Sequence, residues 1–212
     1  MQETDPLQKN LNFFTNLILA REDLTIIYRL LCLVTQVDGG IRSEKYEEIV
    51  NSIIETYGFG QVKTIKQLAK AGLCYKKGTQ KPKCGFPEFK KQHKLIDTTY
   101  DSHDAKVRKY YSYGAYIPLT VKIVEHAFKE IWLTGQLVDM IPGRMAVDGD
   151  PRYAASSMQI KRVVMVYMVG GLTYSEIGLM RNLARLYNIE LVIAITNILS
   201  HKRMLAPFTQ TD

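Results

Sequence analysis

The pattern of hydrophobic and polar positions is clearest toward the C-terminal end of the chain, where it predicts a strand, a tight turn and a helix. Residues 163–169 form a near-continuous apolar run rich in β-branched side chains, as in a strand that is buried on both faces of a parallel sheet. Gly170 and Gly171 then permit a tight turn. Thr173 and Glu176 have the spacing of a capping box, in which two side chains satisfy free backbone donors at the start of a helix.

A second apolar run, over 191–195, predicts another buried strand, so the whole stretch is expected to form a right-handed βαβ unit. Two parallel strands bury little by themselves, because parallel sheets need neighbouring strands and covering helices. Few other segments have the pattern of a strand. We therefore expect an incomplete sheet, which favours an interaction protein over a self-contained enzyme. The helix between the strands has an apolar face of Leu172, Ile177, Met180, Leu183, Ala184 and Tyr187.

Apolar residues at helical spacing predict a short helical bundle in the first third of the chain. One helix is expected to begin at Leu24 and to end at Gly39 and Gly40. The next has Ser43 as its N-cap and ends at Gly58. The apolar faces consist of Ile27, Leu30, Leu31, Val34 and Val37 in the first helix, and of Tyr46, Ile49, Val50, Ile53 and Tyr57 in the second.

A third short helix is expected from Thr64, whose spacing to Gln67 is again that of a capping box, to Gly72. Residues 1–23 show little periodicity and are assigned to an N-terminal leader. Residues 75–112 lose the helical pattern and contain several glycines and prolines, which predicts a basic insertion or linker.

Helical periodicity returns near residue 113, with Pro118 at the first position of a further helix. The expected fold class is α/β with an α-helical subdomain: a short helical bundle precedes a partial parallel, Rossmann-like sheet. The apolar face of the further helix consists of Val121, Val124, Phe128 and Ile131, and the expected domains are the leader 1–23, the helical subdomain 24–74, the basic insertion 75–112 and the α/β part 113–212.

The net charge of +7 arises from one stretch of the chain. Residues 61–96 contain ten lysines and one acidic residue, Glu88, so this stretch carries +9 and the remainder −2. Lysines interleaved with aromatic residues can contact phosphates and bases, so one hypothesis is a small winged-helix nucleic-acid-binding protein that uses the Lys63–Lys94 region. The preferred interpretation is a solvated loop, or one that touches acidic lipid or an acidic partner.

Candidate metal ligands are poorly arranged. Cys74, Cys84, His93 and His103 contain the right donor atoms for zinc, but nine, eight and nine residues separate them, unlike the short paired spacings of zinc sites. We therefore expect no metal site. Three cysteines without an apolar leader indicate a reducing cytosol, and the longest apolar stretch is shorter than the roughly 20 residues that a membrane span needs.

Catalytic groups are equally sparse. His126 and His201 have no nearby nucleophile or convincing carboxylate partner. The turn at Gly170 and Gly171 resembles a phosphate-binding turn, but it lacks the third glycine of a dinucleotide fingerprint and the lysine of a P-loop. The sequence therefore predicts neither an enzyme nor a cofactor.

Several short words of the sequence, in their order and rough spacing, resemble the SM family of SNARE-regulating proteins, and the GG-x-T-x-x-E-I word after an apolar strand is the most specific of them. The resemblance covers about residues 24–208. The words are RLLCLVTQVDGGI at 29–41, TYGF at 56–59, LAKAGL at 68–73, YIPLTVKIVE at 116–125, MIPG at 140–143, VYMVGGLTYSEIGLMRNLA at 166–184 and IAITNILS at 193–200.

The resemblance implies a non-enzymatic role in SNARE-mediated membrane fusion. The branch of the family that the words match best implies a subunit of the HOPS and CORVET tethers, peripheral on late endosome, vacuole or lysosome membranes. Such a subunit docks on the C-terminal helical part of vacuolar protein sorting-associated protein 16. A family member is roughly three times longer, so the domains that grip SNAREs are expected to be missing here. Tyr57 and Phe59, which flank a glycine, are the predicted aromatic anchors for docking.

Overall fold

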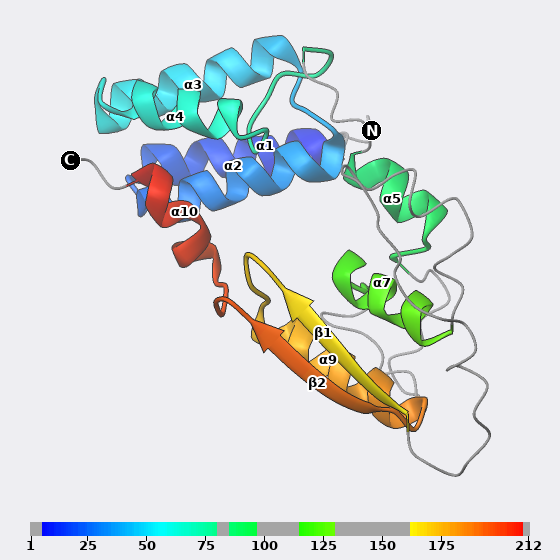
Figure 1. The fold of residues 1–212 in the computed structure, drawn as a ribbon. Helices are drawn as coiled ribbons and strands as arrows, with labels where there is room; N and C mark the ends of the chain where they lie inside the picture. Colours follow the sequence, from blue (N-terminus) through cyan, green and yellow to red (C-terminus); the bar gives the residue numbers. More distant parts are fainter. Residues whose placement is uncertain (1–5, 80–84, 97–114, 130–161, 210–212) are drawn as a thin grey trace. The chain divides into compact units, whose positions relative to one another are not determined.

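A computed structural model gives the fold of the chain (Figure 1). Helices and one small parallel sheet make up the described part of the chain, which confirms the predicted mixed α/β class. The structure describes residues 6–79, 85–96, 115–129 and 162–209, and their side chains from Asn12 onward.

The chain forms two compact units. The first comprises residues 1–88 together with 200–212, and the second comprises residues 89–199. The first unit includes the last helix of the chain, which was expected to belong to the α/β part; the predicted domain boundaries stay a prediction. The helices of the first unit are α1 (Pro6–Leu19), α2 (Leu24–Asp38), α3 (Ser43–Tyr57), α4 (Gln61–Lys70) and α10 (His201–Thr209), and α5 (Phe86–Gln92) crosses its boundary.

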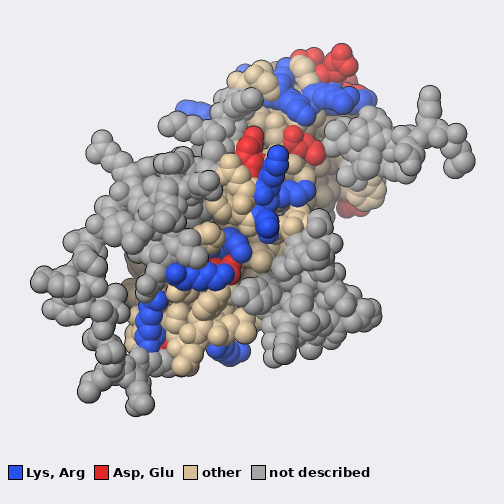
Figure 2. Space-filling view, turned by 90° about the vertical axis from the view of Figure 1, so that its right-hand side faces the viewer, with Lys and Arg blue, Asp and Glu red and all other residues tan. Residues whose placement is uncertain are grey.

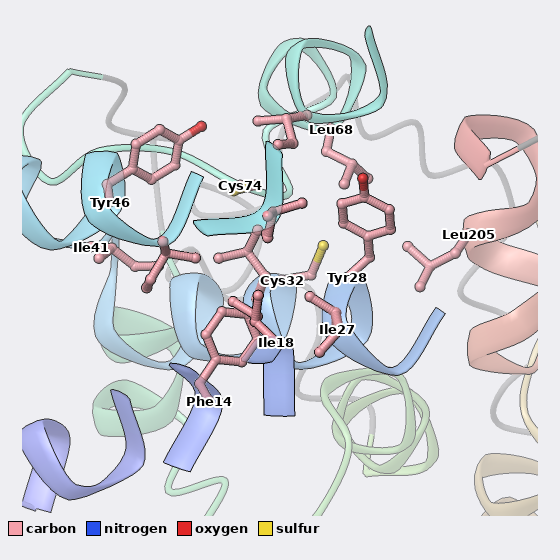
Figure 3. Close-up of a cluster of buried hydrophobic side chains, with 14 residues drawn as sticks. Phe14, Ile18, Ile27, Tyr28, Cys32, Ile41, Tyr46, Leu68, Cys74 and Leu205 are labelled. Atoms are coloured by element: carbon pink, nitrogen blue, oxygen red, sulfur yellow. The ribbon is translucent and has the colours of Figure 1, made fainter. Parts of the chain in front are cut away.

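All five helices contribute to one hydrophobic core in the first unit (Figure 3). Ile18 of α1, Ile27 of α2 and Leu205 of α10 are each 0% exposed, although they are far apart in sequence. Burying a side chain of this size contributes about 1.5–3 kcal/mol to folding. Cys32 and Cys74 lie in the same core as free thiols, and burial raises the pKa of Cys32 to about 12.

Helix α2 matches its prediction closely. Asp23 caps its start, because its carboxylate accepts a hydrogen bond of 2.6 Å from the Thr25 amide. Gly39 ends it in the left-handed conformation, and its amide donates to the Thr35 carbonyl.

Two predicted helix starts are wrong. Ser43 is the first residue of α3 and not its N-cap, since Arg42 holds the cap position without a side-chain hydrogen bond. A parallel bridge between Ile41 and Lys76 sets the entry of the chain into this helix. Helix α4 begins at Gln61 and not at Thr64, which is buried within the helix. Hydrogen bonds of the turn before Gln61 lead the chain into α4. Thr64 and Gln67 therefore lie inside the helix and do not form a capping box at its start.

Three of the described helices were not expected. Helix α1 lies within the predicted leader, and it is held by buried Phe14 and Ile18. Helix α10 contains Pro207, whose missing N–H removes one helical hydrogen bond near the end of the helix. Helix α5 lies inside the predicted insertion 75–112, whose other parts fall mostly outside the described residues.

The second unit contains the predicted βαβ unit. Strand β1 (Val163–Met168) pairs in parallel with β2 (Glu190–Ile195), in the register Val164 to Leu191. Helix α9 (Tyr174–Leu186) connects them and starts with the predicted capping box of Thr173 and Glu176. Helix α7 (Leu119–Phe128) packs beside α9, with Pro118 at its N-cap position, one residue before the predicted place. Ile131 of the predicted α7 face lies outside the described residues.

The prediction that β1 is buried on both faces is wrong for the described part of the chain. The burial of β1 alternates along the strand, and one face of the sheet packs with α9 into the second core (Figure 1). The opposite face carries Met165 and Tyr167, which are 63% and 61% exposed. A parallel strand has this alternation when only one of its faces is covered.

Candidate partner-docking site

The corner between α3 and α4 holds both residues that the sequence singled out. Helix α3 ends at Tyr57, and Gly58 follows with φ of 92°, a conformation that favours glycine. The amide of Gln61 donates to the Gly58 carbonyl at 3.2 Å, and that of Val62 donates to the Phe59 carbonyl at 3.1 Å. The chain therefore turns directly from one helix into the next.

Two tyrosine hydroxyls fix this corner. Tyr57 donates a hydrogen bond of 2.5 Å to the carbonyl of Glu22, and its ring packs against the first core. Buried Tyr28 donates a hydrogen bond of 2.7 Å to Oε1 of Gln61, at the first residue of α4. Sequence reasoning missed the role of Gln61, because a contact across 33 residues leaves no local pattern.

The two predicted anchors differ in their surroundings. Tyr57 is half-buried and points toward the core, whereas Phe59 is 80% exposed. Hydrogen bonds hold the backbone that carries this ring before a partner binds, which lowers the entropic cost of association. Phe59 is thus the residue of the pair that can enter a pocket on another protein.

The uncovered face of the sheet is a second apolar surface. In a parallel pair, residues in register point to the same side, so Met165 lies beside Val192 and Tyr167 beside Ala194. Val163 and Val169 extend this face and are 61% and 78% exposed. No described element packs on it, and an apolar patch of this kind is typical of a surface that another protein or domain covers.

The candidate phosphate-binding turn is occupied by the protein itself. The amide of Gly170 donates to the Thr196 hydroxyl, and that of Leu172 donates to the Asn197 carbonyl. The amide of Thr173 donates to the carboxylate of Glu176 in the capping box. These three amides already have acceptors within the chain, so the turn is structural.

The weak zinc pattern gains no support. Among the described residues, no group of three or more His, Cys, Asp or Glu side chains is arranged to hold a metal ion. Cys84 and His103 lie outside the described residues. In the same described part of the chain, no helix is long and apolar enough to cross a membrane.

A buried carboxylate organises the second unit. Glu125 is 4% exposed, and its two oxygens lie 2.7 Å from Nζ of Lys122 and 2.6 Å from Nζ of Lys129. The Tyr187 hydroxyl, just beyond α9, donates to the same carboxylate at 3.5 Å. Burial by itself would raise the pKa of Glu125, but the two lysines outweigh it and hold this pKa below its usual value.

Replacing Glu125 with glutamine should destabilise the chain by about 2 kcal/mol, because two partly buried lysines would lose their charged acceptor. The midpoint of urea unfolding measures this loss. Glu48 pairs with Lys45 at 2.5 Å on the surface and offers a matched control. Glu48→Gln should cost less than about 0.5 kcal/mol. Equal losses in both variants would contradict the structural role of Glu125.

Two histidines pack edge to face in the second unit. The ring centroids of His93 and His126 lie 6.0 Å apart, and Phe89 stacks on His93 at 6.2 Å. His93 is buried, and its Nε2 has no hydrogen-bond partner among the residues that the structure describes. The pKa of His93 is lowered mainly by burial and further by the charges of His126 and Lys122. The pKa of His126 is lowered mainly by burial and further by the charge of Lys122.

This pair predicts a loss of stability in mild acid. The folded state holds His93 neutral below the pKa of about 6.5 at which the unfolded chain takes up a proton. The unfolded state therefore binds more protons, and stability falls as the pH drops below about 6.5. Urea unfolding between about pH 7 and pH 5.5 should give a smaller dependence of stability on pH for His93→Phe than for the parent. An unchanged dependence would show that His93 is not the group responsible.

Comparison with known proteins finds relatives that are 25–26% identical to this chain. Each alignment covers most of this chain, which spans about a third of the length of these curated relatives. Vacuolar protein sorting-associated protein 33A of Rattus norvegicus is 26% identical, over 89% of this chain and 32% of the relative. Vacuolar protein-sorting-associated protein 33 homolog of Arabidopsis thaliana is 26% identical, over 93% of this chain and 36% of the relative. Vacuolar protein sorting-associated protein 33B of Danio rerio is 25% identical, over 84% of this chain and 35% of the relative.

The family model described as "Sec1 family" matches residues 2–207. The match includes both units and the corner at Tyr57 and Phe59, and it covers the strand–turn–helix word on which the resemblance to SM proteins rested. The chain therefore belongs to the Sec1 family, a non-enzymatic family of SM proteins that act in vesicle transport.

Proposed function

We propose that this chain is an SM-type subunit of a HOPS- or CORVET-like tethering complex, in which its main retained role is to dock on the C-terminal helical part of vacuolar protein sorting-associated protein 16. The names of its relatives support a place in vacuolar protein sorting. The chain aligns with about a third of those relatives, so SNARE binding and support of membrane fusion are proposed for the assembled complex.

The exposed ring of Phe59 is the observation that carries the docking proposal. The ring is 80% exposed on a corner whose backbone is already held by hydrogen bonds, so a partner can cover it without reordering the turn. Phenylalanine in an apolar pocket is a common anchor of protein interfaces. Tyr57 contributes from the inside, by holding the corner to the Glu22 carbonyl.

The uncovered sheet face supports an interacting role independently. Its exposed residues, among them Met165 and Tyr167, are what a sheet would present to a further layer of the assembly. Because the family is non-enzymatic, the expectation that this chain is not an enzyme is confirmed.

The proposed location follows from the same assignment. A tether subunit of this class is peripheral on late endosome, vacuole or lysosome membranes and faces the cytoplasm. The nucleic-acid hypothesis for the Lys63–Lys94 region receives no support from the family match. Helix α9 is not available as a recognition helix either, because it packs on the sheet and into the second core.

Co-expression with the C-terminal helical region of protein 16, followed by gel filtration, tests the proposed function. The chain should elute with this partner as a stoichiometric complex, whereas the chain alone should elute separately and aggregate more, since its apolar surfaces are uncovered. A stable monomer that does not bind the partner would contradict the docking proposal.

A further inference from the structure

Three lysines form an exposed row on the outer side of α4. Lys63, Lys66 and Lys70 recur at the i, i+3 and i+7 spacing that places side chains on one face of a helix, and all three are exposed. The row extends for about 10 Å along the helix axis. The opposite side of the same helix consists of the buried residues Thr64, Ile65 and Leu68.

The charge of this row is not neutralised by neighbouring acids. Within the described residues, no carboxylate forms an ion pair with these three lysines. Lys45 and Lys76 differ in this respect, since they pair with Glu48 and Glu47. The sequence of residues 56–87 contains seven lysines and no acidic residue. Figure 2 shows acidic and basic side chains lying close together on the face of the molecule that it draws.

The chemistry of the row fits a surface of phosphate head groups better than a nucleic acid. Helix α4 carries no aromatic side chain on which a base could stack, and no arginine to read a base edge or to grip a phosphate with two hydrogen bonds. Lysines on flexible stems act as point charges, and this suits the mobile head groups of an anionic membrane. The inner side of α4 is committed to the core, and the lysines are the only charged side chains of this helix, so they dominate its accessible side.

We propose that the Lys63, Lys66 and Lys70 row is a direct contact site for anionic phospholipid head groups. The site is separate from the proposed docking on protein 16, because it uses the charge of the outer side of α4 and not the ring of Phe59. Each lysine held near an anionic surface strengthens binding about fivefold. The three lysines together should therefore raise the partition coefficient of the chain onto anionic vesicles roughly 100-fold. Such a contact is weak by itself and becomes useful in a complex with several membrane contacts.

Co-sedimentation of the full chain with vesicles tests this site. Vesicles with about 30% phosphatidylserine in phosphatidylcholine should bind the chain, pure phosphatidylcholine vesicles should not, and added salt should release it. The triple variant Lys63→Gln, Lys66→Gln, Lys70→Gln should have a partition coefficient onto the phosphatidylserine vesicles that is roughly 100-fold lower. All three positions are exposed, so circular dichroism and thermal unfolding should stay unchanged.

A second triple variant, Lys90→Gln, Lys91→Gln, Lys94→Gln, removes the same charge from exposed positions elsewhere in the basic stretch. It should retain most of the partition onto phosphatidylserine vesicles. An equal loss in this control would show that net charge and not the α4 row drives binding, and would overturn the proposal. Tighter binding of the parent to a DNA duplex than to the vesicles, abolished by the α4 variant, would overturn it in favour of a nucleic-acid site.

Discussion

Replacing Phe59 with aspartate is expected to weaken binding to the helical region of protein 16 by about 100-fold or more. A buried aromatic anchor contributes at least about 2 kcal/mol to an interface, and a carboxylate in its pocket adds an unpaired charge. The stability of the isolated chain should change by less than about 0.5 kcal/mol, because Phe59 is 80% exposed. Isothermal titration calorimetry and urea unfolding measure the two quantities.

Phe13 provides the matched control for this experiment. It is an exposed phenylalanine of the same unit, 61% exposed on α1. Phe13→Asp should leave partner binding unchanged. Global unfolding of Phe59→Asp would show instead that Phe59 is a core residue, and an equal loss of binding in both variants would show that the effect is not specific to the corner.

Replacing Gly171 with alanine is expected to destabilise the second unit by at least about 3 kcal/mol. A Cβ atom at Gly171 would lie 2.2 Å from the carbonyl oxygen of Asn197. The turn cannot move away, because the Leu172 amide donates to that same oxygen at 3.2 Å. The change therefore forces β1 and α9 away from the segment that follows β2. Hydrogen exchange of the strand amides measures the loss.

Gly170 separates this clash from backbone strain. Its φ of 101° is close to the 99° of Gly171, but a Cβ atom at Gly170 would meet nothing within 4 Å. Gly170→Ala should therefore cost only the conformational strain, about 1 kcal/mol. Equal destabilisation by the two substitutions would mean that the close approach to Asn197 has no energetic role.

Much of the fold could be predicted from local signals. The capping box of Thr173 and Glu176, and the glycine that ends α2, are recognisable because both act within one helical turn. The resemblance to SM proteins is confirmed by the family match. Helix α1 was missed although its buried residues, Phe14 and Ile18, have the i, i+4 spacing of one helix face, and their burial depends on α2 and α3, which lie later in the chain.

The remaining errors concern contacts that are distant in sequence. An apolar run such as residues 163–169 has the same pattern whether one or both of its faces are covered, so the sequence could not predict the exposure of Met165 and Tyr167. The TYGF word was found by resemblance, but the inward direction of Tyr57 and the outward direction of Phe59 follow from the hydrogen bond to Glu22 and from the turn at Gly58.

Hydrogen exchange of the chain with and without the helical region of protein 16 tests the central claim most directly. The partner should slow exchange at the corner formed by residues 58–62 and leave the amides of α1 unaffected. A stable complex with unchanged exchange at 58–62 and new protection elsewhere would contradict docking through Phe59.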